Sequence, residues 1–237
     1  MPNLFQSACL SLVLISSLAH TAQADIQEIK SYTDPLVKSE LAKRGGEETW
    51  VIYDIDNTLL HPLTMVGSHQ WGDHLRDQRL ALGDSKETAE DFQHASFSAV
   101  QSQVPVALTE EAALATIELF KRKKSPQFAL TARHSEIIDE TLNQTLRLGI
   151  NFENTFPELS GGDHSIHRGV VFSGETPKGV LLKRLIAMSK VKPKKIIFFD
   201  DRRYNLESVE KELKSEAIEF MGLRYAHQDK EVSAFRA

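Results

Sequence analysis

Short apolar runs recur along the chain, and three of them end abruptly in acidic or hydroxyl side chains. Residues 50–53 are followed by Asp54, residues 196–199 by Asp200, and residues 128–130 by Thr131. Unbroken apolar runs of this length, rich in β-branched and aromatic residues, are typical of strands covered on both faces. The pattern therefore predicts a parallel sheet with polar groups at the carboxyl ends of its strands, where open α/β sheets bind ligands.

Helical patterns lie between these runs. One helix is predicted after Thr109, with residues 112, 114, 115, 119 and 120 facing the sheet. Further helices are predicted over 135–148, from 176 onward and over 205–214. Strands and helices that alternate at this spacing predict a doubly wound parallel sheet. Residues 26–41 are predicted as one or two short helices, and 217–225 as an edge strand. A hairpin is predicted within 151–175, with Gly161-Gly162 as its turn.

The segment 61–108 is polar and long for a loop, so it is expected to have its own structure or a function. It contains four histidines whose spacing matches no strong metal-binding motif. Only His61 and His69, which follow the first acidic pair most closely, are candidates for lining a substrate pocket.

Composition places the chain among soluble globular proteins. Its 237 residues are 41% hydrophobic and 26% charged, enough for an α/β domain with an insertion. The formal net charge of −5 argues against a nucleic-acid partner, which requires a basic surface.

The first 24 residues have the pattern of a secretory signal peptide. They contain no charged side chain, and an apolar core over 10–18 precedes the small-residue site Ala22-Gln-Ala24. The core is too short to span a bilayer stably, so no stable membrane anchor is expected after cleavage. No lysine or arginine precedes the core, which leaves an uncleaved anchor as the alternative. Cys9, the only cysteine, lies in this signal, so no disulfide is predicted in the mature chain 25–237.

The motifs occur in a fixed order: Asp54-x-Asp56-x-Thr58, then Thr131, then Lys178, then Asp200-Asp201. This set resembles the haloacid dehalogenase (HAD) superfamily of phosphotransferases and phosphohydrolases. The resemblance implies a HAD-like, Rossmannoid doubly wound sheet with a small helical cap at about 61–108. Gly-Leu-Arg-Tyr at 222–225, together with the signal, is similar to a bacterial group of secreted, largely uncharacterised members. A secreted or periplasmic location is therefore expected.

The first motif supplies the candidate catalytic carboxylates. A carboxylate can accept a phosphoryl group as an acyl phosphate, and the resemblance gives this role to Asp54. Asp56 is then the general acid and afterwards the base for the hydrolytic water. An acid that works near neutral pH needs a raised pKa, which we expect crowding by other carboxylates to produce in Asp56.

Clustered carboxylates beside an incoming phosphate dianion require a divalent cation, and hard oxygen ligands suit Mg²⁺. By resemblance, Asp54 contributes its side chain, Asp56 its backbone carbonyl, and one of Asp200 and Asp201 the remaining carboxylate. The sequence leaves open which of the last two binds the metal, and capping of the following helix is their structural alternative.

Lys178 is the most informative single residue. Thr176 as cap and Pro177 in the first turn place it at a helix N-terminus, where the helix dipole disfavours a cation. A residue whose charge conflicts with its local position in a helix often has a function, so we expect Lys178 and Thr131 to bind the substrate phosphate. A solvent-exposed lysine is the simpler alternative. Arg133 is expected to contact substrate or to pair with an acid.

These features predict a Mg²⁺-dependent phosphatase that hydrolyses a small phosphomonoester through an aspartyl phosphate, with the substrate and the oligomeric state left open. A phosphoacceptor receiver domain shares the residue types, but there the acid pair ends the first strand, the reverse of the order here. The other alternative is a secreted binding or effector protein that keeps the scaffold with little or no turnover.

Overall fold

The computed structural model describes residues 24–43 and 45–235. The predicted signal peptide, apart from Ala24, lies outside the described residues. Within the described part of the chain, no helix is both long enough and apolar enough to cross a membrane.

A seven-stranded sheet forms the centre of the molecule, in the order β1-β9-β8-β2-β5-β7-β6. All neighbouring strands are parallel except β6 and β7. This confirms the predicted α/β class. The strands are β1 Ala24–Ile29, β2 Thr49–Tyr53, β5 Gln127–Thr131, β6 Ile166–His167, β7 Val170–Phe172, β8 Lys195–Asp200 and β9 Glu219–Tyr225.

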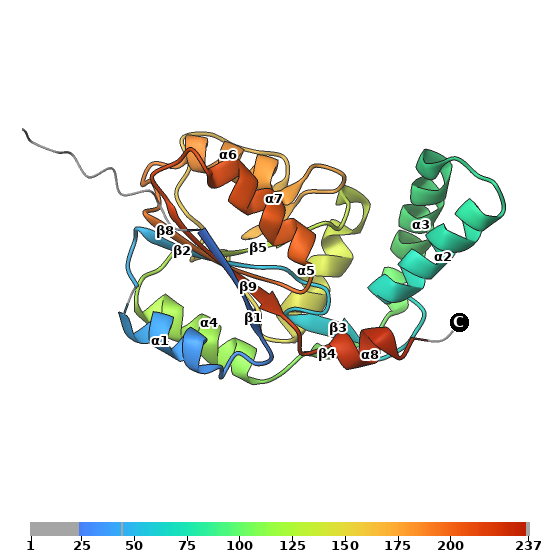
Figure 1. Cartoon of the computed structure of the whole chain (residues 1–237), viewed down its shortest axis with the longest axis horizontal. Helices are drawn as coiled ribbons and strands as arrows, with labels where there is room; N and C mark the ends of the chain where they lie inside the picture. The colour runs from blue at the N-terminus through green and yellow to red at the C-terminus, as the bar shows by residue number, and fades with distance from the viewer. Residues whose placement is uncertain (1–23, 44, 236–237) are drawn as a thin grey trace, which may run out of the picture.

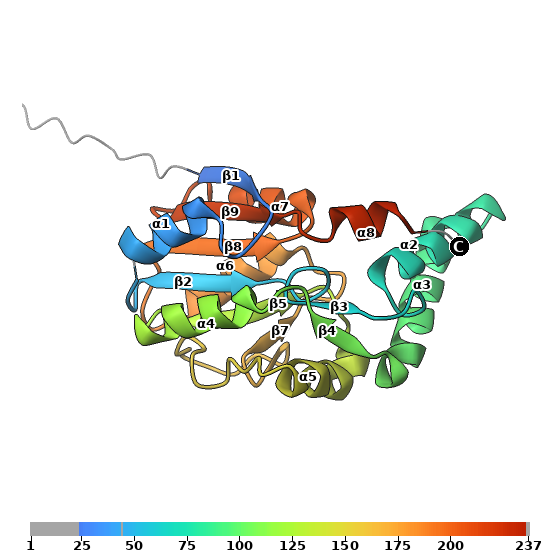
Figure 2. The same cartoon turned by 90° about the horizontal axis from the view of Figure 1, so that it is seen from below.

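Helices cover both faces of this sheet (Figures 1 and 2). Alternate residues of β2 point to opposite faces: Val51 and Tyr53 join one core cluster, and Trp50 and Ile52 the other. Both faces of β2 are therefore buried from solvent, and this explains why its sequence is a continuous apolar run. On the first face lie α1 Pro35–Lys43, α4 Ala112–Arg122 and α5 Ile138–Arg147; on the second lie α6 Lys178–Met188 and α7 Arg203–Leu213.

The chain reverses its direction of strand addition beside β2. It passes from β2 outward to β5 and β7, then crosses back to β8 on the other side of β2 and continues to β9. Such a switch point opens a crevice at the carboxyl ends of the two central strands. The acidic motifs end these two strands.

Residues 60–108 form an insert beyond the carboxyl ends of the strands (Figures 1 and 2). Its stem is an antiparallel pair, β3 Leu60–Pro62 and β4 Val106–Leu108. Its body is the helix pair α2 His69–Ala81 and α3 Lys86–Val100, followed by the 3-10 turn η1 Gln101–Gln103. The hydroxyls of Ser68 and Ser85 cap the two helices, each accepting a backbone N–H at 3.1 Å.

The N-terminal segment differs from the prediction. Residues 24–29 form strand β1 rather than a helix, because their backbone pairs with β9 and this tertiary contact overrides the local pattern. The edge position predicted for residues 217–225 is therefore wrong: β9 is an inner strand, and β1 occupies the edge beside it. The helix predicted from Asp34-Pro35 is present as α1.

Two further details differ. The hairpin β6–β7 turns at Arg168-Gly169, not at Gly161-Gly162, because both turn residues have positive φ (48° and 79°), as a two-residue hairpin requires. On α4 the buried residues are Ala113, Thr116, Ile117 and Phe120, so only Phe120 of the predicted face is fully buried. The hydroxyl of Thr109, which lies before α4, donates to the Thr58 carbonyl at 2.7 Å.

Candidate active site

The ends of β2, β5 and β8 bring the sequence motifs together. Six of the predicted residues line one cavity at this edge of the sheet: Asp54, Asp56, Thr131, Arg133, Lys178 and Asp201. The seventh, Asp200, is fully buried behind the cavity and contacts Lys178. Successive motifs that are 22 to 73 residues apart in the sequence thus form one site, as their resemblance to the HAD superfamily predicts.

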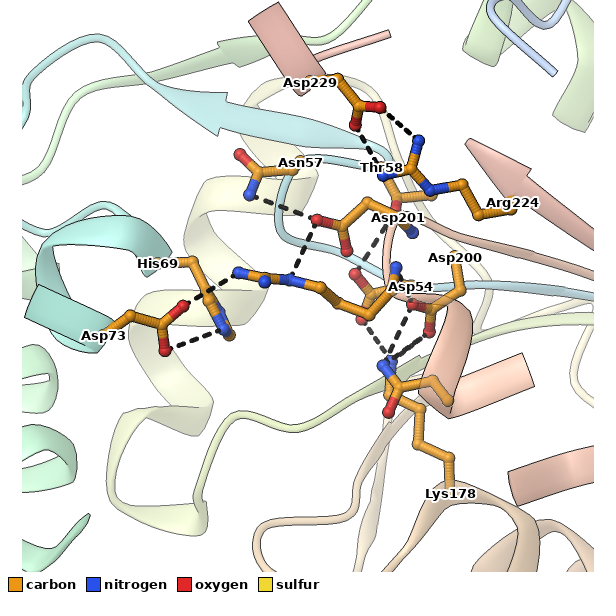
Figure 3. Close-up of polar contacts among 12 residues, drawn as sticks. Asp54, Asn57, Thr58, His69, Asp73, Lys178, Asp200, Asp201, Arg224 and Asp229 are labelled. Atoms are coloured by element: carbon orange, nitrogen blue, oxygen red, sulfur yellow. Dashed lines mark hydrogen bonds and ion pairs between the residues drawn. The ribbon is translucent and has the colours of Figure 1, made fainter. Parts of the chain in front are cut away.

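Lys178 is buried between two carboxylates (Figure 3). Its Nζ lies 2.5 Å from Asp54 Oδ1 and 2.7 Å from Asp200 Oδ2. Burial alone lowers the pKa of this ammonium, but the two carboxylates outweigh burial and raise it. The exposed-lysine alternative is therefore wrong. The two carboxylates already offset the unfavourable position of Lys178 at the N-terminus of α6, so a bound phosphate is not needed to stabilise its positive charge there.

The neighbours Asp200 and Asp201 have different environments. Asp200 accepts from Lys178, from the Asn205 amide at 3.0 Å and from the Arg202 N–H at 2.8 Å. Asp201 lines the cavity, and the contacts of its carboxylate with the described residues are long, 3.5 Å to Asn57 Nδ2 and 3.4 Å to Arg202 Nε. Asp201 is therefore the member of the pair with oxygen atoms available to a ligand.

The loop after β2 links the two acidic motifs (Figure 3). The Thr58 hydroxyl accepts the Asp201 N–H at 3.0 Å and lies 3.4 Å from Asp54 Oδ2, to which it donates. Asn57 has a φ of 58°, a left-handed conformation that asparagine tolerates better than most residues. This turn directs the Asn57 amide toward Asp201.

Oxygen atoms of Asp54, Asp200 and Asp201 lie within 4.8 Å of one another. Burial raises the pKa of Asp54 to about 7 despite the attraction of Lys178, and the Asp200 charge adds to the increase. Burial, with the Asp54 charge, also raises the pKa of Asp201. A single lysine does not neutralise three buried carboxylates, so a hard divalent cation such as Mg²⁺ fits this donor set.

Asp56 is held by Arg133 in a two-point ion pair. Arg133 Nε lies 2.9 Å from Asp56 Oδ2, and its Nη2 lies 2.8 Å from Oδ1. Burial alone raises the pKa of Asp56, but the guanidinium outweighs it and lowers the pKa. The expectation that crowding by carboxylates raises the pKa of Asp56 is therefore wrong: Asp54 and Asp201 experience that effect, and Arg133 protects Asp56 from it.

Comparison with known proteins places the whole described chain in one family. Residues 25–237 match the family described as "Protein of unknown function (DUF2608)". The chain belongs to the DUF2608 family.

Relatives of this DUF2608 chain occur in chlamydiae and carry the description "Putative outer membrane protein". The one from Chlamydia trachomatis is 26% identical over 178 residues, which is 74% of this chain and 68% of the relative. The one from Chlamydia pneumoniae is 24% identical over 186 residues, 77% of this chain and 71% of the relative. A similar solved structure is the HAD domain of the effector protein Lem4 from Legionella pneumophila, in an inactive mutant. It has a TM-score of 0.38 and 15% identity, and covers 76% of this chain and 86% of that one.

The outer wall of the cavity comes from residues of which the sequence singled out only His69. Helices α2 and α3 of the DUF2608 chain contribute His69, Gln93, His94, Phe97 and Ser98. The core contributes His134, Arg202, Tyr204 and Asn205. Among the insert histidines, the structure places His69 at the cavity as expected, whereas His61 is in β3 and does not line it. The rings of His94 and His134 lie 4.1 Å apart across the insert–core boundary, a contact without any local sequence signal.

Proposed function

We propose that this chain is a Mg²⁺-dependent phosphatase that hydrolyses a small phosphomonoester through an aspartyl phosphate, an acyl phosphate formed on Asp54. The observation that supports this most is the cluster of Asp54, Lys178 and Asp201 at the floor of a cavity that also contains Asp56. Phosphoryl transfer requires a nucleophile, positive charge around the transferring oxygens and a proton for the leaving group. This cavity has a residue for each.

In the first step Asp54 attacks phosphorus and the ester oxygen leaves. Lys178 fixes one Asp54 oxygen and keeps a positive charge beside it. The Thr131 hydroxyl accepts the Arg133 N–H at 3.2 Å, so its own proton is available to a phosphate oxygen. Asp54, Asp201 and the backbone carbonyl of Asp56 would hold Mg²⁺, which neutralises charge on the transferring group when bound.

Asp56 serves the proton transfers. Both of its oxygens accept from Arg133 in this structure, which is the arrangement of an ionised carboxylate. That form is the base that activates water to hydrolyse the phosphorylated Asp54. To protonate a leaving alkoxide, Asp56 must carry a proton and release one of its contacts with Arg133.

The metal assignment predicts different results for the two neighbouring aspartates. Mg²⁺ should raise the melting temperature of the wild-type protein, because a ligand bound only by the native state stabilises it. Asp201→Asn should lose this Mg²⁺-induced rise, while its metal-free melting temperature is not lowered. Asp200→Asn should lower the metal-free melting temperature, because it removes a partner of buried Lys178. Thermal unfolding with Mg²⁺ and with chelator measures both effects.

Turnover of 4-nitrophenyl phosphate with Mg²⁺, abolished by chelation, is the direct test of the proposed function. Full activity in exhaustively chelated protein would contradict the metal requirement. If Asp201→Asn kept the wild-type Mg²⁺ response and Asp200→Asn alone lost it, the choice of Asp201 would be wrong.

We also propose that the chain is exported. The signal-like pattern of residues 1–24 and the description of the chlamydial relatives as outer membrane proteins both support this. Cleavage after Ala24 should give a mature protein that begins at Asp25. Mass spectrometry of the protein from its native cell envelope measures the N-terminus, and recovery of intact Met1 in the cytosol would contradict the prediction.

A further inference from the structure

A buried chain of hydrogen bonds leads from Asp56 away from the cavity. The Arg133 atoms Nε and Nη2 hold Asp56, and the remaining nitrogen Nη1 donates to two residues of α5. These are Thr141 Oγ1 at 3.1 Å and Gln144 Oε1 at 2.7 Å. Each of the three guanidinium nitrogens therefore has a hydrogen-bond acceptor: Nε and Nη2 share Asp56, and Nη1 donates to α5.

Gln144 continues the chain to the insert. Its Nε2 lies 3.1 Å from the Gln101 carbonyl and 3.3 Å from Gln101 Oε1. Gln101 Nε2 in turn donates to the Gly67 carbonyl at 2.9 Å. Gln101 directly follows α3, and Gly67 directly precedes Ser68, the cap of α2. One glutamine thus ties together the two ends of the α2–α3 pair and connects both to the residue that supports Arg133.

The direction of this chain is fixed by chemistry. Arginine has no acceptor, so the Gln144 oxygen must face Arg133 and its NH₂ group must face Gln101. Arg133, Gln144 and Gln101 are 4%, 7% and 1% exposed, so water does not readily replace a lost partner. The end of the insert is also tightly packed: Gly67 has a φ of 82°, and a Cβ there would lie 2.3 Å from Val104. A shift of the insert at Gln101 therefore disturbs the contacts of Gln144 and Arg133.

We propose that Gln101 and Gln144 are positioning residues that couple the seating of the α2–α3 insert to the placement of Asp56. With the insert seated, Gln144 holds Arg133, and Arg133 holds the Asp56 carboxyl beside the leaving-group oxygen. Displacement of the insert removes the Gln101 acceptors, loosens Arg133 and misplaces Asp56. This inference rests on the proposed phosphatase function, in which Asp56 transfers protons.

The test compares two leaving groups in single turnovers with Mg²⁺. An alkyl phosphate needs a proton from Asp56 to leave, whereas 4-nitrophenol leaves with little help. Gln144→Leu should slow alcohol release by about tenfold or more and phenol release by less than about threefold. Gln144→Glu keeps an acceptor for Arg133 but loses the donor to Gln101, so it should remain slow on the alkyl phosphate.

Gln127 offers a matched control. It is a buried glutamine on β5, at the end of the strand away from the cavity, and its amide bridges the Tyr53 hydroxyl and the Ile117 carbonyl. Gln127→Leu should lose stability while keeping the wild-type ratio of alkyl to aryl rates. Equal slowing of both substrates in folded Gln144→Leu, or no slowing of either, would overturn the proposal. A wild-type ratio in Gln144→Glu would overturn the link to the insert.

Hydrogen exchange tests the link without relying on activity. Backbone amides at 65–68 and 101–104 should exchange faster in Gln144→Leu than in the wild type, and at the wild-type rate in Gln127→Leu. Unchanged exchange in Gln144→Leu would overturn the link. If the wild-type protein releases no phenol and Asp54 acquires no phosphate, the proposed function fails, and the exchange result alone then decides whether the insert and Arg133 are coupled.

Discussion

Replacement of Asp54 with asparagine should abolish turnover and leave the chain folded. The change removes the nucleophile and one carboxylate of the cation site. Lys178 keeps Asp200 as its ionic partner, so the ammonium is not left unpaired at the N-terminus of α6. Without the Asp54 carboxylate, the proposed covalent route has no acceptor for the phosphoryl group.

The pH dependence of stability separates loss of chemistry from loss of fold. Burial raises the pKa of Asp54 from 3.8 to about 7 in the metal-free fold, so the fold favours its protonated form. That stabilisation is complete below pH 3.8 and is lost as the pH rises through about 7. Asparagine cannot ionise, so metal-free Asp54→Asn should melt above the wild type at pH 8, by more than it does at pH 5.

Calorimetry of both metal-free proteins at the two pH values measures this difference. A variant that melts well below the wild type at pH 8 would contradict the assigned environment of Asp54. Turnover by folded Asp54→Ala within about tenfold of the wild type would contradict the mechanism, because loss of a nucleophile costs far more than that.

The parts of this fold that are visible in the sequence are those fixed by local patterns. Strands β2, β5 and β8 are buried on both faces, and such burial requires unbroken apolar runs that end where the site begins. Lys178 stood out because its position at a helix N-terminus conflicts with the helix dipole, and the conflict is resolved by Asp54 and Asp200.

The parts that the sequence did not reveal depend on contacts between distant segments. Asp56 and Arg133 are 77 residues apart, and nothing local indicates that their ion pair lowers the pKa of Asp56. The link from Gln144 to Gln101 spans 43 residues and joins α5 to the end of the insert. The pattern of residues 24–29 is equally compatible with a helix. They form strand β1 because β9 offers a free edge with which their backbone pairs.

Asp56→Asn should affect the two chemical steps differently. For an alkyl phosphate, formation of phosphorylated Asp54 should fall by about 100-fold or more, because the leaving alkoxide has lost its proton donor. For 4-nitrophenyl phosphate the first step should persist. The variant should also lose roughly 3 kcal/mol of stability, since the Arg133 side chain, itself only 2% exposed, then lacks a carboxylate partner. Assays should therefore be run at temperatures where circular dichroism shows the variant folded.

Hydrolysis of the phosphorylated enzyme should limit the aryl reaction in this variant, because water always needs a base, whatever group left before. Phenol should then appear as a burst equal to the enzyme concentration, and acid-quenched protein should carry phosphate on Asp54. Arg133→Met is the matched control: it breaks the same ion pair but keeps the Asp56 carboxylate as a base, so it should hydrolyse the phosphorylated enzyme faster than Asp56→Asn and give a smaller burst. If Asp56→Asn slows both substrates equally, with no burst and no labelled Asp54, then Asp56 serves the cation site or the fold and not proton transfer.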